Sequence, residues 1–292
     1  FILIISLTSL SVSAAELIGE TDYFDELPEW TGDMALNENE WNETPLAKQG
    51  VTFGQSSRYY LTQTRMSCDK GWIKLERIAV GYGTFSSEMD IPILKGDNII
   101  NDITGANADI YVEEATFEIK GLKETLASGY GMNLYLGGSG WPPPCNVRIF
   151  SDGIRENTNY TEVPFKINKK GERITFIVEL NYNTKTYNFY AKRENGEPEL
   201  LFANNPFAGK EPAKLAGLTF GFHIMVSGDT SATLYNAKIY RGVTAPVAEN
   251  ASIEGEVGPG NVLELNYDYV NGIPEKDSEI NWYMCDADGS NE

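Results

Sequence analysis

Arg173–Pro198 reads RITFIVELNYNTKTYNFYAKRENGEP, and this stretch decides the fold. In its first half, apolar and polar residues alternate, and the apolar face is formed by Ile174, Phe176, Val178 and Leu180. Such a period of two is typical of a strand with one buried face. The residues Asn-Tyr-Asn-Thr at 181–184 have turn chemistry, and the run TYNFYAK behind them alternates in the same way. The stretch therefore predicts a β-hairpin that covers a hydrophobic core with one face.

The same alternation recurs on both sides of this hairpin. Further strands are predicted at Arg58–Met66, Trp72–Val80, Ile110–Lys120, Met132–Leu136, Val147–Phe150, Leu218–Val226 and Ala232–Tyr240. A helical turn is predicted only at Leu122–Ala127, and residues 16–49 are expected to form an extended leading segment. About ten to fourteen strands in roughly 200 residues indicate an all-β fold, in which two antiparallel sheets pack as a sandwich.

The order of these segments resembles the concanavalin A-like, laminin-G-like jelly-roll domains of exported bacterial proteins. The resemblance is carried by ATFEIKG (Ala115–Gly121), GMNLYLGG (Gly131–Gly138), NVRIF (Asn146–Phe150), the hairpin above, and the closing pair at Leu218–Gly242. It covers residues 16–243 and implies a two-sheet jelly roll. The chain departs from the family at Tyr235 and Asn236, where the family has an aspartate before its last strand.

Both ends of the sequence carry signals about setting. Residues 1–15, FILIISLTSLSVSAA, have the apolar core and small-residue site of a signal peptide, and we expect them to be the remainder of one truncated at its start. A linker at Gly242–Pro246 places a domain boundary near residue 244. Residues 244–292 resemble part of a bacterial immunoglobulin-like repeat, carried by Gly260, Leu263, Tyr267, Tyr269 and Ser278–Tyr283. The resemblances imply a multidomain protein that is secreted or attached to the cell surface.

The amino-acid composition restricts the classes of partner and cofactor that we expect for this chain. Lys and Arg number 23 against 42 Asp and Glu, so the net charge of −19 opposes binding to nucleic acid. No membrane span is expected after residue 15, and the oligomeric state is left open. Three cysteines are too few for a disulfide scaffold; export permits a Cys68–Cys145 bridge, but two buried thiols are equally ordinary. No cofactor is expected, although Asp286–Glu292 has the oxygen-rich spacing of a calcium loop as well as that of an ordinary turn.

A tryptophan loop is the first candidate binding site. Ser139–Cys145 reads SGWPPPC and joins two predicted strands, which places Trp141 on a rigid loop at the edge of the sandwich, with Tyr130 and Tyr135 beside it. Aromatic faces of this kind can stack on sugar rings. The alternative is that Trp141 closes one end of the core.

The remaining candidates concern catalysis. His223 is the only histidine and alternates with the apolar Phe220, Phe222 and Ile224. A polysaccharide lyase on this fold would use a His or Tyr base near an Arg, and Tyr135, Arg148 and Tyr190 are the neighbours expected for it. The alternative is a polar histidine on a sheet face.

A glycosidase motif is present only in part. Laminarinase-type enzymes of this fold carry Glu-x-Asp-x-x-Glu, and Glu88 and Asp90 match its first half, but Ile93 or Leu94 stands where the second Glu is needed. The alternative is a solvated turn ahead of a strand. We therefore predict a non-catalytic carbohydrate-binding or adhesion module, with a polysaccharide-degrading enzyme of the same fold or a structural spacer as alternatives.

Overall fold

A computed structural model describes residues 15–33, 36, 38–57, 64–77, 85–101, 103, 110–122, 124, 131–138, 143–168, 170–208, 214–223, 230–242, 247–254 and 264–270. The chain divides into two compact units. Leu17–Arg241 is the larger unit, and the smaller contains residues 242–292 together with residues 1–16.

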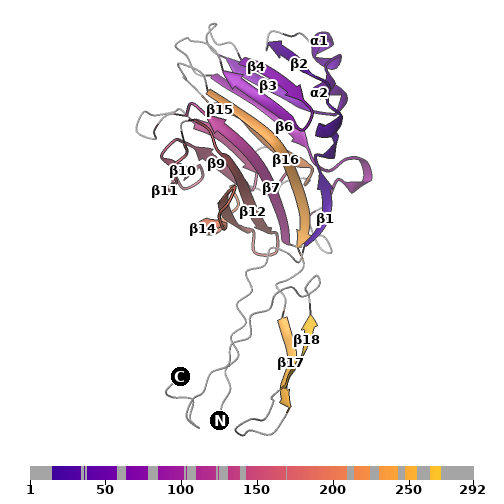
Figure 1. Cartoon of the computed structure of the whole chain (residues 1–292), viewed down its shortest axis with the longest axis vertical. Coiled ribbons are helices and arrows are strands. Elements are labelled where there is room, and N and C mark those ends of the chain that lie inside the picture. The colour runs from indigo at the N-terminus through magenta and orange to yellow at the C-terminus, as the bar shows by residue number, and fades with distance from the viewer. Residues whose placement is uncertain are drawn as a thin grey trace. The chain divides into compact units, whose positions relative to one another are not determined.

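The first sheet of the larger unit (Figure 1) is antiparallel in each strand pairing that the structure describes. Its strands lie in the order β14 (Glu199–Pro206), β13 (Thr186–Arg193), β12 (Arg173–Asn181), β7 (Ile110–Lys120), β16 (Thr230–Gly242), β5 (Trp72–Arg77), β4 (Thr64–Asp69) and β2 (Trp30–Asp33). β1 (Ala15–Glu20) also pairs with β16. Along this pair, Glu20 lies beside Lys238, and the Thr21 N–H that follows β1 donates to the Ala237 carbonyl at 3.0 Å.

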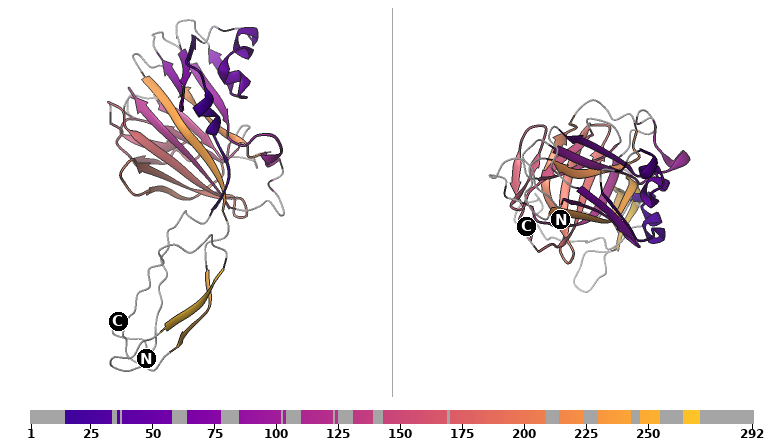
Figure 2. Two further views of the ribbon diagram at one scale, coloured as in Figure 1. Left: turned by 45° about the vertical axis from the view of Figure 1, so that its right-hand side comes forward. Right: turned by 90° about the horizontal axis from the view of Figure 1, so that it is seen from above.

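The second sheet is also antiparallel and packs face to face on the first (Figures 1 and 2). Its order is β11 (Glu162–Pro164), β10 (Gly153–Glu156), β9 (Cys145–Ile149), β8 (Gly131–Leu136), β15 (Gly217–His223), β6 (Phe85–Pro92) and β3 (Thr52–Ser57). Strands that are neighbours in the sheet are often far apart in the chain, as β8 and β15 are. The predicted all-β jelly-roll sandwich is confirmed.

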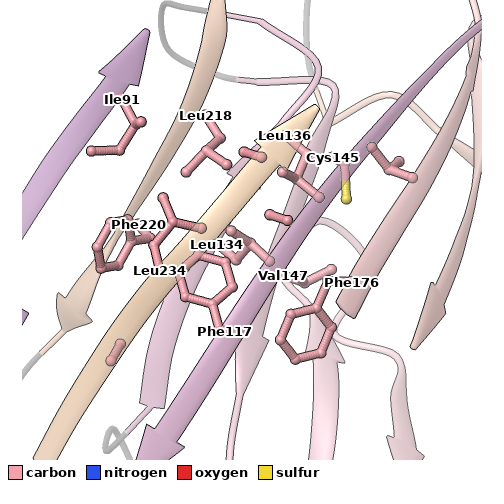
Figure 3. Packing of buried hydrophobic residues seen from close by; sticks show 14 of the residues in the cluster. Ile91, Phe117, Leu134, Leu136, Cys145, Val147, Phe176, Leu218, Phe220 and Leu234 are labelled. Atoms are coloured by element: carbon pink, nitrogen blue, oxygen red, sulfur yellow. The ribbon is translucent and has the colours of Figure 1, made fainter. Parts of the chain in front are cut away.

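The core lies between the two inner faces (Figure 3). Alternation brings Phe117 and Phe176 inward from the first sheet and Phe220 inward from the second, and all three side chains are fully buried. The rings of Phe117 and Phe220 meet edge to face, with centroids 5.1 Å apart. Phe117 thus forms a direct aromatic contact between the sheets.

Residues 16–49 correct the prediction of an extended leading segment. They contain β1, a 3₁₀ turn at Asp22–Glu26, β2 and two short helices, α1 (Glu38–Asn42) and α2 (Pro45–Lys48). At α2, the Thr44 hydroxyl accepts a hydrogen bond from the Ala47 N–H at 3.1 Å, and proline occupies the first helical position. Elements this short have no hydrophobic periodicity, so they could not be predicted from the pattern of apolar residues.

Two other expectations change. Glu88 and Asp90, whose alternative placement was a solvated turn, belong to the eight-residue strand β6. Thr64–Met66, the last part of the strand expected at Arg58–Met66, belongs to β4. Residues 58–63 lie outside the described part, as does most of the predicted turn at Leu122–Ala127.

Cys68 and Cys145 are free thiols, each buried, on strands of different sheets. This agrees with the buried-thiol alternative. Cys68 donates weakly to the Pro28 carbonyl at 3.4 Å.

The smaller unit shows one antiparallel pair, β17 (Val247–Glu254) with β18 (Glu264–Val270). The second predicted strand of the repeat, Ser278–Tyr283, and the Asp286–Glu292 loop lie outside the described residues. In the described part of both units, no helix is long and apolar enough to cross a membrane.

Candidate functional site

A row of polar side chains and glycines crosses the outer face of the second sheet. Along each strand, the residues of this row alternate with residues that face the core, such as the buried Met89, Leu134, Val147 and Phe220. Strand pairing aligns the row from β3 to β10 in the order Gly54, Glu88, Gly221, Asn133, Arg148 and Arg155. Five neighbouring strands are therefore needed to bring its polar members together.

Hydrogen bonds connect the middle of this row. Glu88 Oε1 accepts from the Tyr135 hydroxyl at 3.0 Å and from Asn133 Nδ2 at 3.4 Å. Arg148 Nε in turn donates to Asn133 Oδ1 at 3.0 Å. A carboxylate and a guanidinium are thus linked through one neutral amide, and each holds the other's orientation through it. We call Glu88, Asn133, Tyr135 and Arg148 the polar relay.

The relay has a covered part and an accessible part. Asn133 is 1 % exposed and Tyr135 is 7 % exposed, whereas Glu88 and Arg148 are half-buried. Beside Glu88, Gly54 has open space where a Cβ would stand. Both hydrogen bonds to Glu88 end on Oε1, and the described residues place none on Oε2. Asn133 and Tyr135 therefore position Glu88 and Arg148, and these two can meet a ligand.

Burial sets the electrostatics of the relay. It raises the pKa of the Tyr135 hydroxyl, and the adjacent Glu88 carboxylate raises it further. Burial also lowers the pKa of the Arg148 guanidinium, since a charged group loses hydration there. A tyrosine that donates to a carboxylate and has a raised pKa is poorly suited to act as a general base.

A second group of oxygens lies next to the relay. Asp90 accepts hydrogen bonds from the hydroxyls of Thr219, on β15, and Thr52, on β3, the latter at 3.0 Å. Asp90 and Thr52 are exposed and Thr219 is half-buried. The strand ends at Pro92, and Ile93, where the glycosidase motif needs its second Glu, is buried in the core. The motif match is thus limited to Glu88 and Asp90.

The structure separates the residues proposed for a lyase. Arg148 and Tyr135 lie in the second sheet, as does the backbone of His223, which pairs with Gly131 and Ser86. Tyr190 does not join them and is not the neighbour of His223 that was expected, because it lies on β13 of the first sheet, where it donates to Glu179 at 3.3 Å. The sequence shows which residues share a strand face but not which strands share a sheet.

The tryptophan loop stays a prediction. Trp141 and Tyr130 lie outside the described residues, and only the backbone of His223 is described. Asn133, the center of the relay, was missed. The one available signal was its position in GMNLYLGG, where it shares a strand face with Tyr135.

Comparisons with known proteins give only distant likenesses. No family model matches the sequence, and no curated protein matches it. Among solved structures, lectin I from Ulex europaeus in complex with the methyl glycoside of α-L-fucose is similar at a TM-score of 0.45 and 8 % identity, covering 73 % of this chain and 97 % of that one. Peanut lectin with a nonapeptide gives a TM-score of 0.43 and 10 % identity, covering 73 % and 97 %. Lectin I-B4 from Griffonia simplicifolia in its metal-free form gives 0.43 and 8 %, covering 72 % and 98 %. At this level the likenesses carry no argument about what this chain binds.

No group of three or more His, Cys, Asp or Glu side chains with the arrangement of a metal site occurs among the described residues.

Proposed function

We propose that the sandwich is a glycan-binding module of a secreted or cell-surface multidomain protein, and that it binds its ligand on the outer face of the second sheet without cleaving it. The observation that supports this most directly is the polar relay, in which Glu88 and Arg148 are held in fixed orientations at an accessible surface.

The chemistry of the relay suits a ligand rich in hydroxyl groups. A sugar hydroxyl can donate to Glu88 Oε2 and another can accept from Arg148, and such charge-assisted hydrogen bonds are stronger than neutral ones. The hydrogen bonds within the relay already restrain these side chains, so little ordering remains for binding to accomplish. Asp90 and the Thr52 hydroxyl extend the polar surface toward β3.

The secreted setting and the immunoglobulin-like character of residues 244–292 are part of the proposal. They are supported by the apolar run at residues 1–15, by the acidic composition and by the strand pattern that follows the linker. The Cys68 and Cys145 thiols are buried in the sandwich, so they are shielded from oxidants in an oxidising compartment.

The test is a glycan array probed with the full chain and with Glu88→Gln. This substitution keeps the side-chain shape but removes the charge. We expect glycan affinity to fall by about tenfold or more, because one charge-assisted hydrogen bond is lost. Tyr135→Phe is expected to weaken binding less, because it frees the Glu88 carboxylate without removing it.

Glu179→Gln is a matched control for Glu88→Gln. Glu179 accepts hydrogen bonds from the Asn188 amide at 2.8 Å and from the Tyr190 hydroxyl, the same pair of donor types, but on the outer face of the first sheet. Equal losses in the two variants would argue for a general structural effect and against the relay as the binding site. Release of reducing ends or unsaturated products from any glycan on the array would favour the enzyme alternative.

A further inference from the structure

A hollow on the outer face of the first sheet has no part in the proposed function. It encloses about 460 Å³ over the strands β5, β7 and β16, within the size range of about 300–1,000 Å³ of small-molecule sites. The residues that line it are Trp72, Lys74, Glu76, Glu118, Lys120, Ser231, Thr233 and Tyr235. We call it the first-sheet groove.

Two aromatic side chains stand next to each other in this groove. Pairing of β16 with β5 aligns Leu234 with Ile73, so the residues that follow and precede them, Tyr235 and Trp72, are neighbours across the strands. Tyr235 is fixed from two directions: the Arg173 guanidinium lies 3.9 Å from its ring centroid, and its hydroxyl donates to Glu118 Oε2 at 3.2 Å. The ring is thus held in place before any ligand arrives, and the half-buried Trp72 beside it adds an indole ring to the lining.

The rest of the lining is made of donors and acceptors in pairs. Lys74 Nζ lies 2.8 Å from Glu76 Oε1 on β5, and Lys120 forms an ion pair with Glu118 on β7. Between these two strands, β16 contributes the Ser231 and Thr233 hydroxyls. Ion pairs this close to solvent contribute little to stability, so Lys74, Glu76 and Lys120 can turn toward a ligand at small cost while Glu118 keeps its hydrogen bond to Tyr235.

The charges of the groove lining sum to zero, because two lysines face two glutamates. Arg173, whose guanidinium stacks on the Tyr235 ring, adds one positive charge beside the lining. In a chain of net charge −19, one such charge does not offset the long-range repulsion of an anionic ligand. An entirely apolar ligand would bury these polar groups without partners, which is unfavourable. The chemistry that remains is an uncharged molecule with both hydroxyls and a face that can stack.

We propose that the first-sheet groove binds a neutral oligosaccharide, with a pyranose ring stacked on Trp72 and its hydroxyls shared between the Lys–Glu pairs. Each pair offers a donor beside an acceptor, and a vicinal diol presents the matching acceptor and donor. This site is independent of the polar relay, since it lies on the other sheet. If both sites bind, one sandwich can hold two glycan chains at once and gain avidity on a polymer.

The experiment is titration calorimetry of the full chain with maltohexaose, cellohexaose, xylohexaose, mannohexaose and galactohexaose. For the member that binds, we expect Trp72→Ala to weaken the affinity by about tenfold or more and Trp72→Phe to retain part of it, because a smaller ring still stacks. Lys74→Ala, at a half-buried position, tests the same groove without removing a large ring. Thermal unfolding of each variant confirms that it is folded.

Glu88→Gln separates this inference from the proposed function. Binding that survives Glu88→Gln but is lost in Trp72→Ala and weakened in Lys74→Ala places the sugar in the first-sheet groove. Binding that is lost only in Glu88→Gln places it on the polar relay and overturns the inference about the groove. Failure of all five oligosaccharides to bind the unaltered chain also overturns it.

Discussion

Replacing Phe117 by alanine is expected to lower the free energy of unfolding by about 3–5 kcal/mol, the usual cost of removing a fully buried phenylalanine. Phe117 lies in the first sheet and its ring contacts Phe176 in that sheet and Phe220 in the second. The backbone of β7 cannot move into the space that the ring leaves, because β7 is paired on both sides, with β12 and β16. The loss of stability therefore includes the cost of a cavity as well as the hydrophobic free energy of burying the ring.

Urea unfolding followed by far-UV circular dichroism measures this change, and a domain of this size should lose about 2–4 °C in Tm for each kcal/mol. Phe117→Leu should fall between the wild type and the alanine variant. Leu200→Ala serves as the surface control, because Leu200 is 50 % exposed and its loss should change the free energy by less than about 0.5 kcal/mol. A loss of under about 1 kcal/mol in Phe117→Ala would mean that the two sheets do not depend on this contact.

Glu113→Gln is expected to reduce the dependence of stability on pH. Glu113 points into the sandwich from β7 and is fully buried, and its Oε2 accepts from the Gly137 N–H at 2.6 Å at the end of β8. Its Oε1 has no hydrogen-bond partner among the described residues. Burial raises the pKa of this carboxyl to about 8, although the hydrogen bond from Gly137 opposes the shift.

The stability that Glu113 contributes falls as the pH rises, because its carboxyl has a higher pKa in the folded chain than in the unfolded chain. Between the ordinary pKa of a glutamate, about 4.3, and about 8, the unfolded chain releases the proton while the folded chain keeps it. The stability from this group is thus fully present below the unfolded pKa and is lost as the pH rises through the window, by up to about 1.4 kcal/mol per pH unit. The neighbouring groups Cys145 and Tyr182 also have raised pKa values and stay neutral there.

Free energies of unfolding measured between pH 5.5 and pH 8 check this prediction. The wild type should lose stability as the pH rises, and Glu113→Gln should lose less, so that its advantage over the wild type grows with pH. Glu199→Gln, at an exposed position, removes one charge from the overall repulsion without touching the interior and should follow the slope of the wild type. Parallel slopes in the Glu113 variant and the wild type would contradict the raised pKa of the Glu113 carboxyl.

Much of the sandwich could be predicted from alternation alone, because most of its strands bury one face more deeply than the other. Ile110–Lys120 was predicted with the bounds that the structure gives, and Phe117, Phe176 and Phe189 are buried as their periodicity indicates. β6 was missed as a strand, although Met89 and Ile91 alternate with Glu88 and Asp90 within it. Two carboxylates in close succession were interpreted as a turn, whereas pairing with β15 and β3 holds them on a strand.

The candidate sites could be predicted only in part, since each depends on which strands become neighbours. Alternation indicates that Tyr135 faces outward, but not that β8 lies two strands from β6, which is what brings its hydroxyl to Glu88. The first-sheet groove required Trp72 and Tyr235 to meet across a separation of more than 160 residues in the chain. No local pattern contains that information.

The pairing of β1 with β16 determines how the sandwich would respond to tension. Glu20 lies beside Lys238 and Thr21 beside Ala237, so the pair is antiparallel and its continuation places Leu17 next to Arg241, the two ends of the larger unit. A pulling force applied at those ends would open this pair from one side, one hydrogen bond after another, instead of shearing all of them together. Each residue freed would add about 3.3 Å of length. β1 would thus detach from β16 before the remaining strands of the two sheets separate.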